Sequence, residues 1–356
     1  MSLEQDLRTY VISNQLPGEN PDSVALDEDL LDSGILDSLA IMQLVAHIEK
    51  TYGITIKTEE IDPQYFETIQ ALASFVRSKQ GASVVADSPT EDKQGIQTIL
   101  QDVAKTSIWT LRCRAEEHLH PKGLFQDDKA IEWMARVTWP QELDGWFNDY
   151  ARMGVCVRTK ALDALVQKHL SQASSAQVVE LGCGLSSRYH RIGTELCQWL
   201  DFDRPDVIQA RRELDPETSS HTYLPGDLMD FSWMDSLEGK QSGELIFLAE
   251  GLLMYFDRVQ VIELIEKMKQ RFPGAVFIFD VQGHRARKIN DPITQKVNAA
   301  LKWAVKNKRE VEQLPLRILS TTSLFSHYPE RLGLSRLVYW YPPLRNLNLF
   351  VESYLD

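Results

Sequence analysis

Apolar residues recur at helical spacing through the first eighty residues of the chain. This pattern predicts amphipathic helices over residues 3–16, 38–52 and 68–79, with a short helical piece near residues 59–66. Because each helix has one apolar face, we expect the helices to pack against one another. Residues 1–80 are therefore predicted to form an all-α domain of four helices.

The pattern changes in two steps after this first domain. Small and polar residues dominate residues 81–95 and show no amphipathic period, which is typical of a linker. A helical stretch rich in aromatic residues then extends over residues 96–171. We therefore expect a second domain over residues 96–356 that begins with a helical part.

Short β-rich runs alternate with helical stretches in the rest of the second domain. The runs with strand character are residues 177–181, 199–203, 221–224, 244–250 and 275–281. An amphipathic helix is predicted over residues 259–272, between the last two runs. Such alternation is typical of a doubly wound, mostly parallel sheet. Residues 332–341 and 348–354 are expected to close this sheet as a paired hairpin.

The charge of the chain is concentrated in the first domain. The 356 residues include 38 Lys and Arg and 51 Asp and Glu, which gives a net charge of −13. Residues 1–80 hold 5 basic and 14 acidic residues, so −9 of this charge lies there and −4 in the rest. An acidic face suits basic patches on partner enzymes, although a merely solvated face is the alternative. The acidic balance argues against a nucleic-acid partner.

Several classes of protein are excluded by composition. No apolar run approaches the roughly eighteen residues of a membrane-spanning helix, so we expect no membrane segment. The first residues contain neither a basic start nor an apolar run, which argues against a secretion signal. The cysteines form no Cys-x-x-Cys pair and no Cys/His cluster; they are Cys113, Cys156, Cys183 and Cys197. We therefore expect no disulfide framework, no metal site and a reducing, cytoplasmic location.

One serine in an acidic frame is the most informative motif of the first domain. The stretch Asp32-Ser33-Gly34-Ile35-Leu36-Asp37-Ser38-Leu39 places Ser38 at the predicted start of a helix. A phosphate on Ser38 would lie against the positive end of the helix dipole. The frame resembles the phosphopantetheine site of acyl and peptidyl carrier proteins over residues 1–80. The resemblance implies that a phosphopantetheinyl transferase attaches 4′-phosphopantetheine to Ser38; an ordinary helix cap is the alternative reading.

A glycine-rich turn marks the second domain. Glu180-Leu181-Gly182-Cys183-Gly184-Leu185-Ser186-Ser187-Arg188 follows the first predicted strand and opens a helix. Glycines at such a turn let the backbone approach a ligand closely. Asp203 ends the second predicted strand, where a carboxylate binds ribose hydroxyls. These residues alone fit both NAD and S-adenosylmethionine, although Ser187 replaces the third glycine of the dinucleotide pattern.

Four further blocks favour S-adenosylmethionine. They are residues 114–127, 154–159, 226–233 and 249–256. Together with the glycine turn they resemble the leucine carboxyl methyltransferase family, which includes polyketide O-methyltransferases, over residues 107–290. The resemblance implies a Rossmann-like α/β class I methyltransferase with an N-terminal helical cap.

The resemblance also implies roles for individual residues. Arg158 would pair with the methionine carboxylate of S-adenosylmethionine, Asp203 would accept from the ribose hydroxyls, and Glu250 would lie beside the methionine end. The other implied positions are Gly182 and Gly184 along the methionine and ribose, Asp227 and Leu228 at the adenine, and Tyr255 at the entrance of the acceptor pocket. Packing under the fourth strand is the alternative for Tyr255.

Other polar and aromatic residues of these blocks receive structural interpretations. We expect Arg188 to be a structural ion-pair partner and Glu180 to order the turn, whereas Arg114 fits a ligand or a structural role. The tryptophans are expected in the core or in the wall of the acceptor pocket; they are Trp109, Trp133 and Trp146.

The methyl acceptor decides whether a base is needed. A carboxylate is ionised at neutral pH, whereas a hydroxyl needs a partner for its proton. His284, just past the fifth strand, is the first candidate base and His327 the second; an exposed loop histidine is the alternative for His284. Arg285 and Arg287 would hold an acidic substrate or dock the carrier, unless they are only solvated.

The fusion of two domains predicts the substrate class. A carrier joined to a methyltransferase suggests an acceptor that arrives as a thioester on the Ser38 arm. The thioester consumes one carboxyl group, so a hydroxyl or enol acceptor in polyketide or nonribosomal peptide biosynthesis is favoured, with upstream and downstream synthase enzymes as partners. A methyl ester on a second carboxylate is one alternative, and a docking carrier with an inert methyltransferase fold is another.

Overall fold

The computed structural model describes most of the chain. The described residues are 3–16, 19–20, 24–31, 33, 35–36, 38–54, 56, 65–80, 102–137, 139, 149–193, 195, 197–237, 243–288, 299–332 and 346–356. Contacts within the chain separate it into two compact units, whose main boundary falls between Lys93 and Gln94. The linker predicted over residues 81–95 lies outside the described residues.

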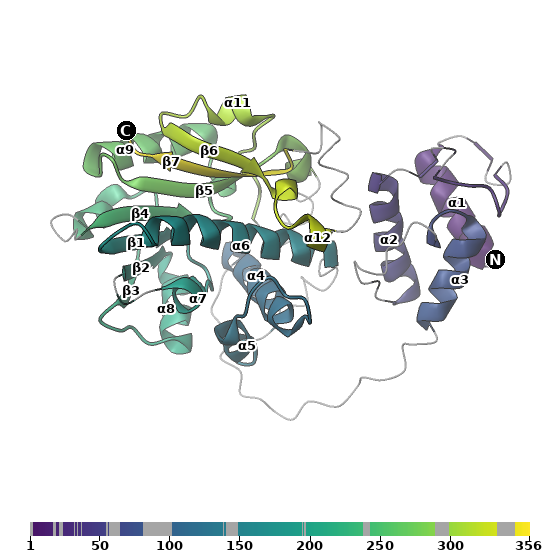
Figure 1. Cartoon of the computed structure of the whole chain (residues 1–356), viewed down its shortest axis with the longest axis horizontal. Helices are drawn as coiled ribbons and strands as arrows, with labels where there is room; N and C mark the ends of the chain where they lie inside the picture. The colour runs from purple at the N-terminus through teal and green to yellow at the C-terminus, as the bar shows by residue number, and fades with distance from the viewer. Residues whose placement is uncertain are drawn as a thin grey trace. The chain divides into compact units, whose positions relative to one another are not determined.

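The first unit is helical. Its described helices are α1 (Leu3–Gln15), α2 (Ser38–Tyr52) and α3 (Ile69–Gln80), shown in purple and blue in Figure 1. Their apolar faces form one core, in which Leu7, Ile48 and Leu72 are fully buried. The short helix predicted near residues 59–66 falls mostly outside the described residues, so the count of four helices stays a prediction.

Polar contacts tie the helices of the first unit together. The Tyr52 hydroxyl at the end of α2 donates to Asp6 Oδ2 on α1 at 2.6 Å, and Arg77 on α3 pairs with Glu4 on α1. Burial and the Asp6 carboxylate raise the pKa of Tyr52, so it stays a donor at neutral pH. Ser38 is the first residue of α2, which agrees with its predicted place at a helix start.

The second unit is built on a seven-stranded sheet. Its order is β3-β2-β1-β4-β5-β7-β6 (Figure 1), where the strands are β1 (Ala176–Leu181), β2 (Cys197–Asp203), β3 (His221–Pro225), β4 (Glu244–Ala249), β5 (Val276–Gln282), β6 (Arg317–Ser323) and β7 (Asn348–Tyr354). Strands β1 to β5 are parallel, and β7 runs antiparallel between β5 and β6. The predicted doubly wound, mostly parallel sheet is therefore confirmed.

Helices alternate with these strands. The short α7 (Arg188–Ile192), α8 (Pro205–Leu214) and α9 (Arg258–Arg271) follow β1, β2 and β4, as expected for a Rossmann-like fold. Three helices precede the sheet in the chain: α4 (Asp102–Leu119), α5 (Asp128–Met134) and α6 (Asp149–Leu170). They supply the helical part expected before the sheet, and their role as a cap stays a prediction.

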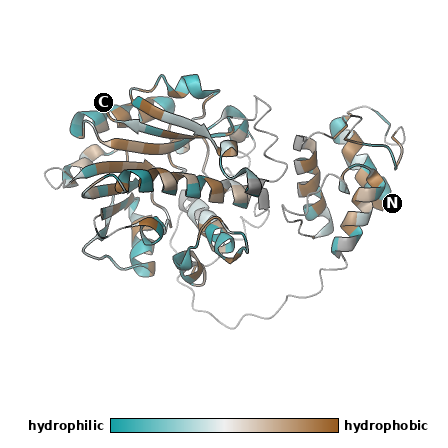
Figure 2. Cartoon of the chain, viewed as in Figure 1, coloured by the Kyte–Doolittle hydropathy of each residue, from teal (hydrophilic) through white to brown (hydrophobic). Residues whose placement is uncertain are grey.

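The centre of the sheet is apolar. Residues of β1, β4 and β5 are almost all buried, and Figure 2 shows these strands as largely hydrophobic. Phe247, Phe277 and Phe279 are fully buried there. Continuous apolar runs of this kind are typical of parallel strands covered on both faces. Among the described residues, none of the helices combines the length and apolarity needed to span a membrane.

The predicted closing hairpin was wrong in one strand. The partner of β7 on its outer side is β6, not residues 332–341; Leu332 ends the short helix α12 (Pro329–Leu332), and residues 333–341 lie outside the described residues. Strand β6 reads Arg-Ile-Leu-Ser-Thr-Thr-Ser and is half exposed along its length. An edge strand with so few apolar residues has a weak periodic signal, which is why the sequence pattern missed it.

Candidate functional site

The glycine turn lies where β1 ends. Gly182 and Gly184 have φ angles of 64° and 51°, a region that side chains with a Cβ rarely adopt. A Cβ on Gly182 would lie 2.5 Å from Leu252 Cδ1, and a Cβ on Gly184 would lie 2.9 Å from Ser107 Cβ on α4. Both glycines are therefore required by conformation and by space. The turn is held by the Gly182 amide, which donates to the Phe202 carbonyl at 2.8 Å.

Asp203 closes the same turn from the end of β2. Its Oδ2 accepts from the Gly184 amide at 2.7 Å, and its Oδ1 accepts from the Arg204 amide at 2.7 Å. Burial raises the pKa of Asp203 to about 6, although these two backbone donors act in the opposite direction. Each carboxylate oxygen keeps further acceptor capacity, so the group is able to bind a diol.

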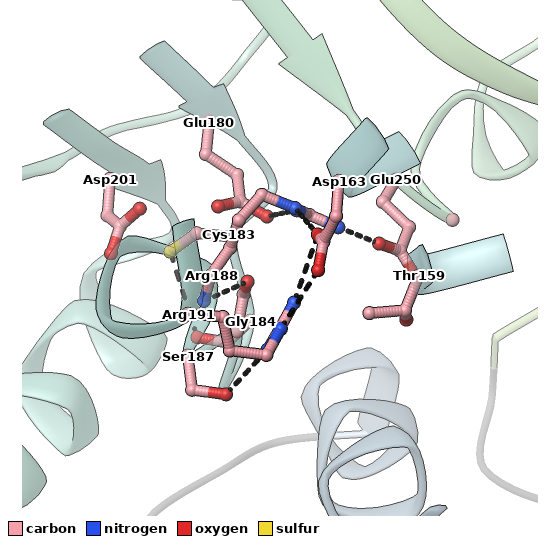
Figure 3. Close-up of polar contacts among 12 residues, drawn as sticks. Thr159, Asp163, Glu180, Cys183, Gly184, Ser187, Arg188, Arg191, Asp201 and Glu250 are labelled. Carbon is pink, nitrogen blue, oxygen red and sulfur yellow. Dashed lines mark hydrogen bonds and ion pairs between the residues drawn. The ribbon is translucent and has the colours of Figure 1, made fainter. Parts of the chain in front are cut away.

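A buried ion network fixes the chain just after the turn (Figure 3). Arg188, 1% exposed, begins α7; its Nε donates to Asp163 Oδ1 on α6 at 2.6 Å, and its two terminal nitrogens bond Glu180 and Glu250. Arg191 continues the network to Asp163. The structure thus places Arg188 in the structural ion pairs that the sequence favoured for it, and Glu180 beside it at the turn.

A second arginine holds Glu250 from the other side. Arg158 Nε on α6 donates to Glu250 Oε1 at 2.9 Å, and the Thr159 hydroxyl donates to the same oxygen at 3.0 Å. Burial raises the pKa of Glu250, but Arg158 and Arg188 together lower it to about 2. Glu250 is therefore a fixed anion, and the structure brings it together with Arg158 as expected from their shared predicted role.

Asp280 is a site residue that the sequence analysis missed. This carboxylate of β5 is 1% exposed; its Oδ1 accepts from the Gly251 amide at 2.5 Å, and its Oδ2 lies 3.7 Å from Arg158 Nη1. Gly251 has a φ angle of 64°, and a Cβ there would lie 3.2 Å from the Arg158 guanidinium. The available signal was the lone acidic residue in the apolar run Phe277-Ile278-Phe279-Asp280-Val281.

Asp227 and Leu228 lie in the loop after β3. Asp227 is exposed, and its Oδ1 accepts from the Met229 amide at 2.9 Å, whereas Leu228 is 6% exposed. The Gly226 amide donates to the Asp203 carbonyl at 2.9 Å, which ties this loop to the end of β2. An apolar side chain beside a carboxylate suits a purine ring with an exocyclic amine, so the predicted adenine role is retained as a prediction.

Tyr255, His284 and His327 have different surroundings. The Tyr255 side chain is hydrogen-bonded to Thr106 of α4, and burial raises the pKa of its hydroxyl. His284 follows β5 with an exposed side chain, and its amide donates to the Val305 carbonyl at 2.9 Å. His327 is half-buried and its Nε2 lies 2.9 Å from Thr322 Oγ1; burial lowers its pKa. The catalytic roles of these residues stay predictions.

Arg114 and Trp133 have structural surroundings. Arg114 bonds the Leu185 carbonyl and lies 3.3 Å from Asp127 Oδ2, which gives it a structural role behind the glycine turn. Trp133 is fully buried in the core between α4, α5 and α8. Trp109 is partly buried, and Trp146 lies outside the described residues.

These side chains gather at one edge of the sheet. Because β1 to β5 are parallel, the glycine turn, Asp203, the loop with Asp227, Glu250 and Asp280 all lie at or near the carboxyl ends of strands. Ligands of open α/β sheets bind at this edge. The edge offers a cradle without Cβ atoms, a carboxylate for a diol, and paired arginine and carboxylate groups for a zwitterion.

Comparisons with known proteins agree with this arrangement. Residues 111–269 match the leucine carboxyl methyltransferase family, and residues 12–76 match the phosphopantetheine attachment site family. The tetracenomycin polyketide synthesis O-methyltransferase TcmP of Streptomyces glaucescens is 25% identical over 225 residues, which cover 60% of this chain and 79% of that protein. The D-alanyl carrier protein of Streptococcus pyogenes serotype M1 is 33% identical over 60 residues, 17% of this chain and 76% of that protein.

The first part of the chain belongs to the phosphopantetheine carrier family, and its second part is similar to leucine carboxyl methyltransferases over residues 111–269. An S-adenosylmethionine-dependent methyltransferase of Gibberella zeae, dpfgK, is 23% identical over 239 residues, 60% of this chain and 78% of that protein. A solved structure of a methyltransferase from Thermobifida fusca has a TM-score of 0.44 and 13% identity over 68% of this chain and 93% of that chain.

The glycine turn alone fits both NAD and S-adenosylmethionine. The match to methyltransferases decides in favour of S-adenosylmethionine. The described residues fit this cofactor. Gly184 has a left-handed backbone conformation and a close contact with Ser107 that exclude a side chain. Asp203 is a carboxylate whose hydrogen-bond donors are backbone amides, and Arg158 and Glu250 carry the opposite charges that an amino-acid group needs. This geometry is consistent with the cofactor-binding roles predicted for these residues, which remain proposals.

The pKa of Asp203 predicts how cofactor affinity depends on pH. Ribose hydroxyls donate to the ionised carboxylate, so affinity falls as the pH drops through about 6 and the carboxyl group takes up a proton. At pH 5 we expect affinity about tenfold weaker than at pH 7.5, measured by calorimetry with S-adenosylmethionine. Asp203→Asn should bind weakly at both values and lose the slope. A slope that persists in this variant would contradict the assignment.

Asp280 predicts a second effect on cofactor binding. Asp280→Asn keeps the size of the side chain but removes the charge that faces Arg158, so the guanidinium loses a charge-assisted contact. We expect S-adenosylmethionine affinity to fall roughly 10–100-fold, in line with about 1.5–3 kcal/mol for such a contact. Asp230→Asn, an exposed carboxylate at a 3₁₀ cap, is the matched control. Unchanged affinity in a folded Asp280→Asn protein would show that Arg158 needs no such support.

Proposed function

We propose that the methyltransferase domain transfers a methyl group to an oxygen of an acyl chain held as a thioester on a 4′-phosphopantetheine arm at Ser38. The reaction belongs to polyketide or nonribosomal peptide biosynthesis, and a hydroxyl or enol is the favoured acceptor. The observation that carries the proposal is the presence, in one chain, of a carrier domain and a methyltransferase domain with a complete cofactor edge. A phosphopantetheinyl transferase and neighbouring synthase enzymes are the implied partners.

The cofactor side of the reaction is assigned to the residues of the sheet edge. S-adenosylmethionine supplies a methyl group on a sulfonium. Arg158 and Glu250 hold the amino-acid end, Asp203 holds the ribose, and Asp227 with Leu228 holds the adenine. The ion network keeps Arg158 and Glu250 in place before any ligand binds, which reduces the reorganisation that binding requires.

A hydroxyl that receives the methyl group needs a base to take its proton, and this base must lie outside the ion network. Glu250 has a pKa of about 2, so its carboxylate is too weak a base for a hydroxyl. Tyr255 is neutral at physiological pH because burial raises its pKa, which suits it to orient an acceptor oxygen by hydrogen bonding. His284 lies after the carboxyl end of β5 with an exposed ring, where a substrate oxygen can reach it.

Two alternatives remain within this proposal. Arg285 is exposed beside His284, and a cationic group there suits a free carboxylate, so methyl ester formation is the second candidate. It is also the reaction in the name of the matched family.

An inert fold that serves only as a docking carrier is disfavoured, because the glycine turn, Asp203 and Glu250 all keep ligand-binding geometry. The four described cysteines are buried free thiols, which supports the cytoplasm as the site of the reaction.

The attachment site predicts a clear result by intact-protein mass spectrometry. The full chain is incubated with a broad phosphopantetheinyl transferase and acyl-coenzyme A, and S-adenosylmethionine is then added. The wild type should gain the acyl arm and then one methyl group on the arm, because the acceptor is tethered. Ser38→Ala should gain neither, whereas Ser33→Ala in the same acidic frame should behave as the wild type. An arm on Ser38→Ala would refute the carrier assignment; a loaded arm that is never methylated would refute the substrate.

The acceptor class predicts the pH profile of methyl transfer. With a hydroxyl acceptor the rate should rise with pH through a histidine-like pKa near about 6.5, since the base must be neutral. His284→Gln should then slow turnover roughly 10²–10⁴-fold with unchanged S-adenosylmethionine affinity. A carboxylate acceptor is ionised throughout, so a flat profile with an active His284→Gln protein would favour methyl ester formation. A sloped profile with an active variant would move the base to His327.

A further inference from the structure

A cluster of two histidines and one aspartate lies away from the cofactor edge. Among the described residues, His190, Asp215 and His221 form the group whose potential metal-binding atoms all lie within 4.8 Å of one another. His190 is on α7, Asp215 follows α8, and His221 begins β3. His221 is therefore at the amino end of its strand, whereas the cofactor residues lie at the carboxyl ends.

The two histidines approach the same carboxylate oxygen. His190 Nε2 lies 2.7 Å from Asp215 Oδ2, and His221 Nδ1 lies 3.7 Å from that oxygen. The 3.7 Å between His221 Nδ1 and Asp215 Oδ2 is too long for a hydrogen bond. If Nδ1 carries no proton, its lone pair faces the Asp215 carboxylate. A cation between these atoms relieves that repulsion. Zinc bonds to histidine nitrogen and carboxylate oxygen are roughly 2.0–2.2 Å, so small rotations suffice to place one ion among the three groups.

The other nitrogen of His221 is already fixed by a carboxylate. His221 Nε2 donates to Asp201 Oδ2 at 2.8 Å, and both side chains are 1% exposed. This bond sets the tautomer of His221, so that Nδ1 carries the free lone pair. A carboxylate that accepts from the far nitrogen of a ligating histidine is the arrangement that orients histidine ligands in metal sites.

Charged side chains surround the cluster, and the cluster is open to solvent on the side of His190. Asp215 Oδ2 accepts from His190 Nε2 at 2.7 Å and from the Tyr223 hydroxyl at 3.0 Å. Arg211 pairs with Asp201, while Lys129 lies 3.9 Å from Asp215 and 2.8 Å from Glu132. Glu132 also lies 4.0 Å from Arg136, so these three carboxylates are balanced by three cations, and the case for an ion rests on the geometry of the ligand atoms. The His190 side chain is 27% exposed, which opens the cluster to solvent.

We propose that His190, Asp215 and His221 bind a divalent transition-metal ion of the Zn²⁺ type, with water completing the coordination. The proposed site differs from the expectation of no metal site, which rested on cysteine spacing and did not consider ligands spread over residues 190 to 221. It joins α7 to the end of α8 and to β3. Because α7 begins at Arg188, a bound ion also braces the segment that follows the glycine turn.

Cobalt binding to the full chain tests the site. The protein, free of affinity tags and treated with a chelator, is titrated with Co²⁺ and the visible absorption is recorded. We expect one equivalent to bind, with a spectrum of a site that contains nitrogen ligands, and Zn²⁺ to displace it. His190→Gln should weaken binding by more than about 100-fold, and Asp201→Asn, which touches no metal, by about 10–100-fold. His120→Gln, which removes an imidazole elsewhere, should bind as the wild type.

Two results would overturn the proposal. One is the absence of saturable binding at one equivalent in a folded wild-type protein. The other is a His190→Gln variant that binds Co²⁺ as the wild type does. Thermal unfolding separates a ligand from a structural hydrogen bond: Zn²⁺ should raise the midpoint of the wild type and not that of His190→Gln, whereas equal midpoints with and without Zn²⁺ in both proteins would assign the cluster to hydrogen bonding alone.

Discussion

The ion pairs of Arg188 are the constraint on which the cofactor edge depends. One guanidinium, buried at the first residue of α7, bonds carboxylates from three separate elements: Asp163 of α6, Glu180 of β1 and Glu250 after β4. Removal of one partner from a buried pair costs about 3–5 kcal/mol, because it leaves uncompensated charge. A substitution at any residue of the network therefore destabilises the fold. The network also fixes the glycine turn relative to α6, which carries Asp163.

This network also divides the carboxylates of the edge into two kinds. Glu250 faces Arg158 and Arg188, which hold it ionised at any physiological pH. Asp203 has no such paired arginines and accepts from two backbone amides, so burial raises its pKa and its charge depends on the surrounding pH. Neither is a suitable base for a hydroxyl: the first has too low a pKa, and the second is already engaged by the turn. If a hydroxyl is the acceptor, as proposed, proton transfer must use groups outside the network.

The sequence predicted the features that local physics specifies. Runs rich in apolar residues predicted β1, β4 and β5 at nearly their observed bounds, and the glycine turn lies where its spacing placed it. It missed features that depend on distant residues. Strand β6 is recognisable only once β7 is beside it, because its own residues are mostly polar. Asp280 acquires its role from Gly251 and Arg158, and the histidine and aspartate cluster from residues on α7, α8 and β3. No local pattern contains such contacts.

Tethering explains why the two sides of the proposed reaction are built so differently. A substrate that diffuses freely must be bound by contacts of its own, whereas one held on a flexible arm arrives at an effective concentration set by the tether, which reaches millimolar for short linkers. In the proposed reaction the acceptor side would then rely on few polar contacts, such as Tyr255 and the exposed His284. The cofactor has no tether, so its affinity must come from the protein. A rigid, charge-paired edge supplies that affinity, and this is where the chain has placed its buried arginines and carboxylates.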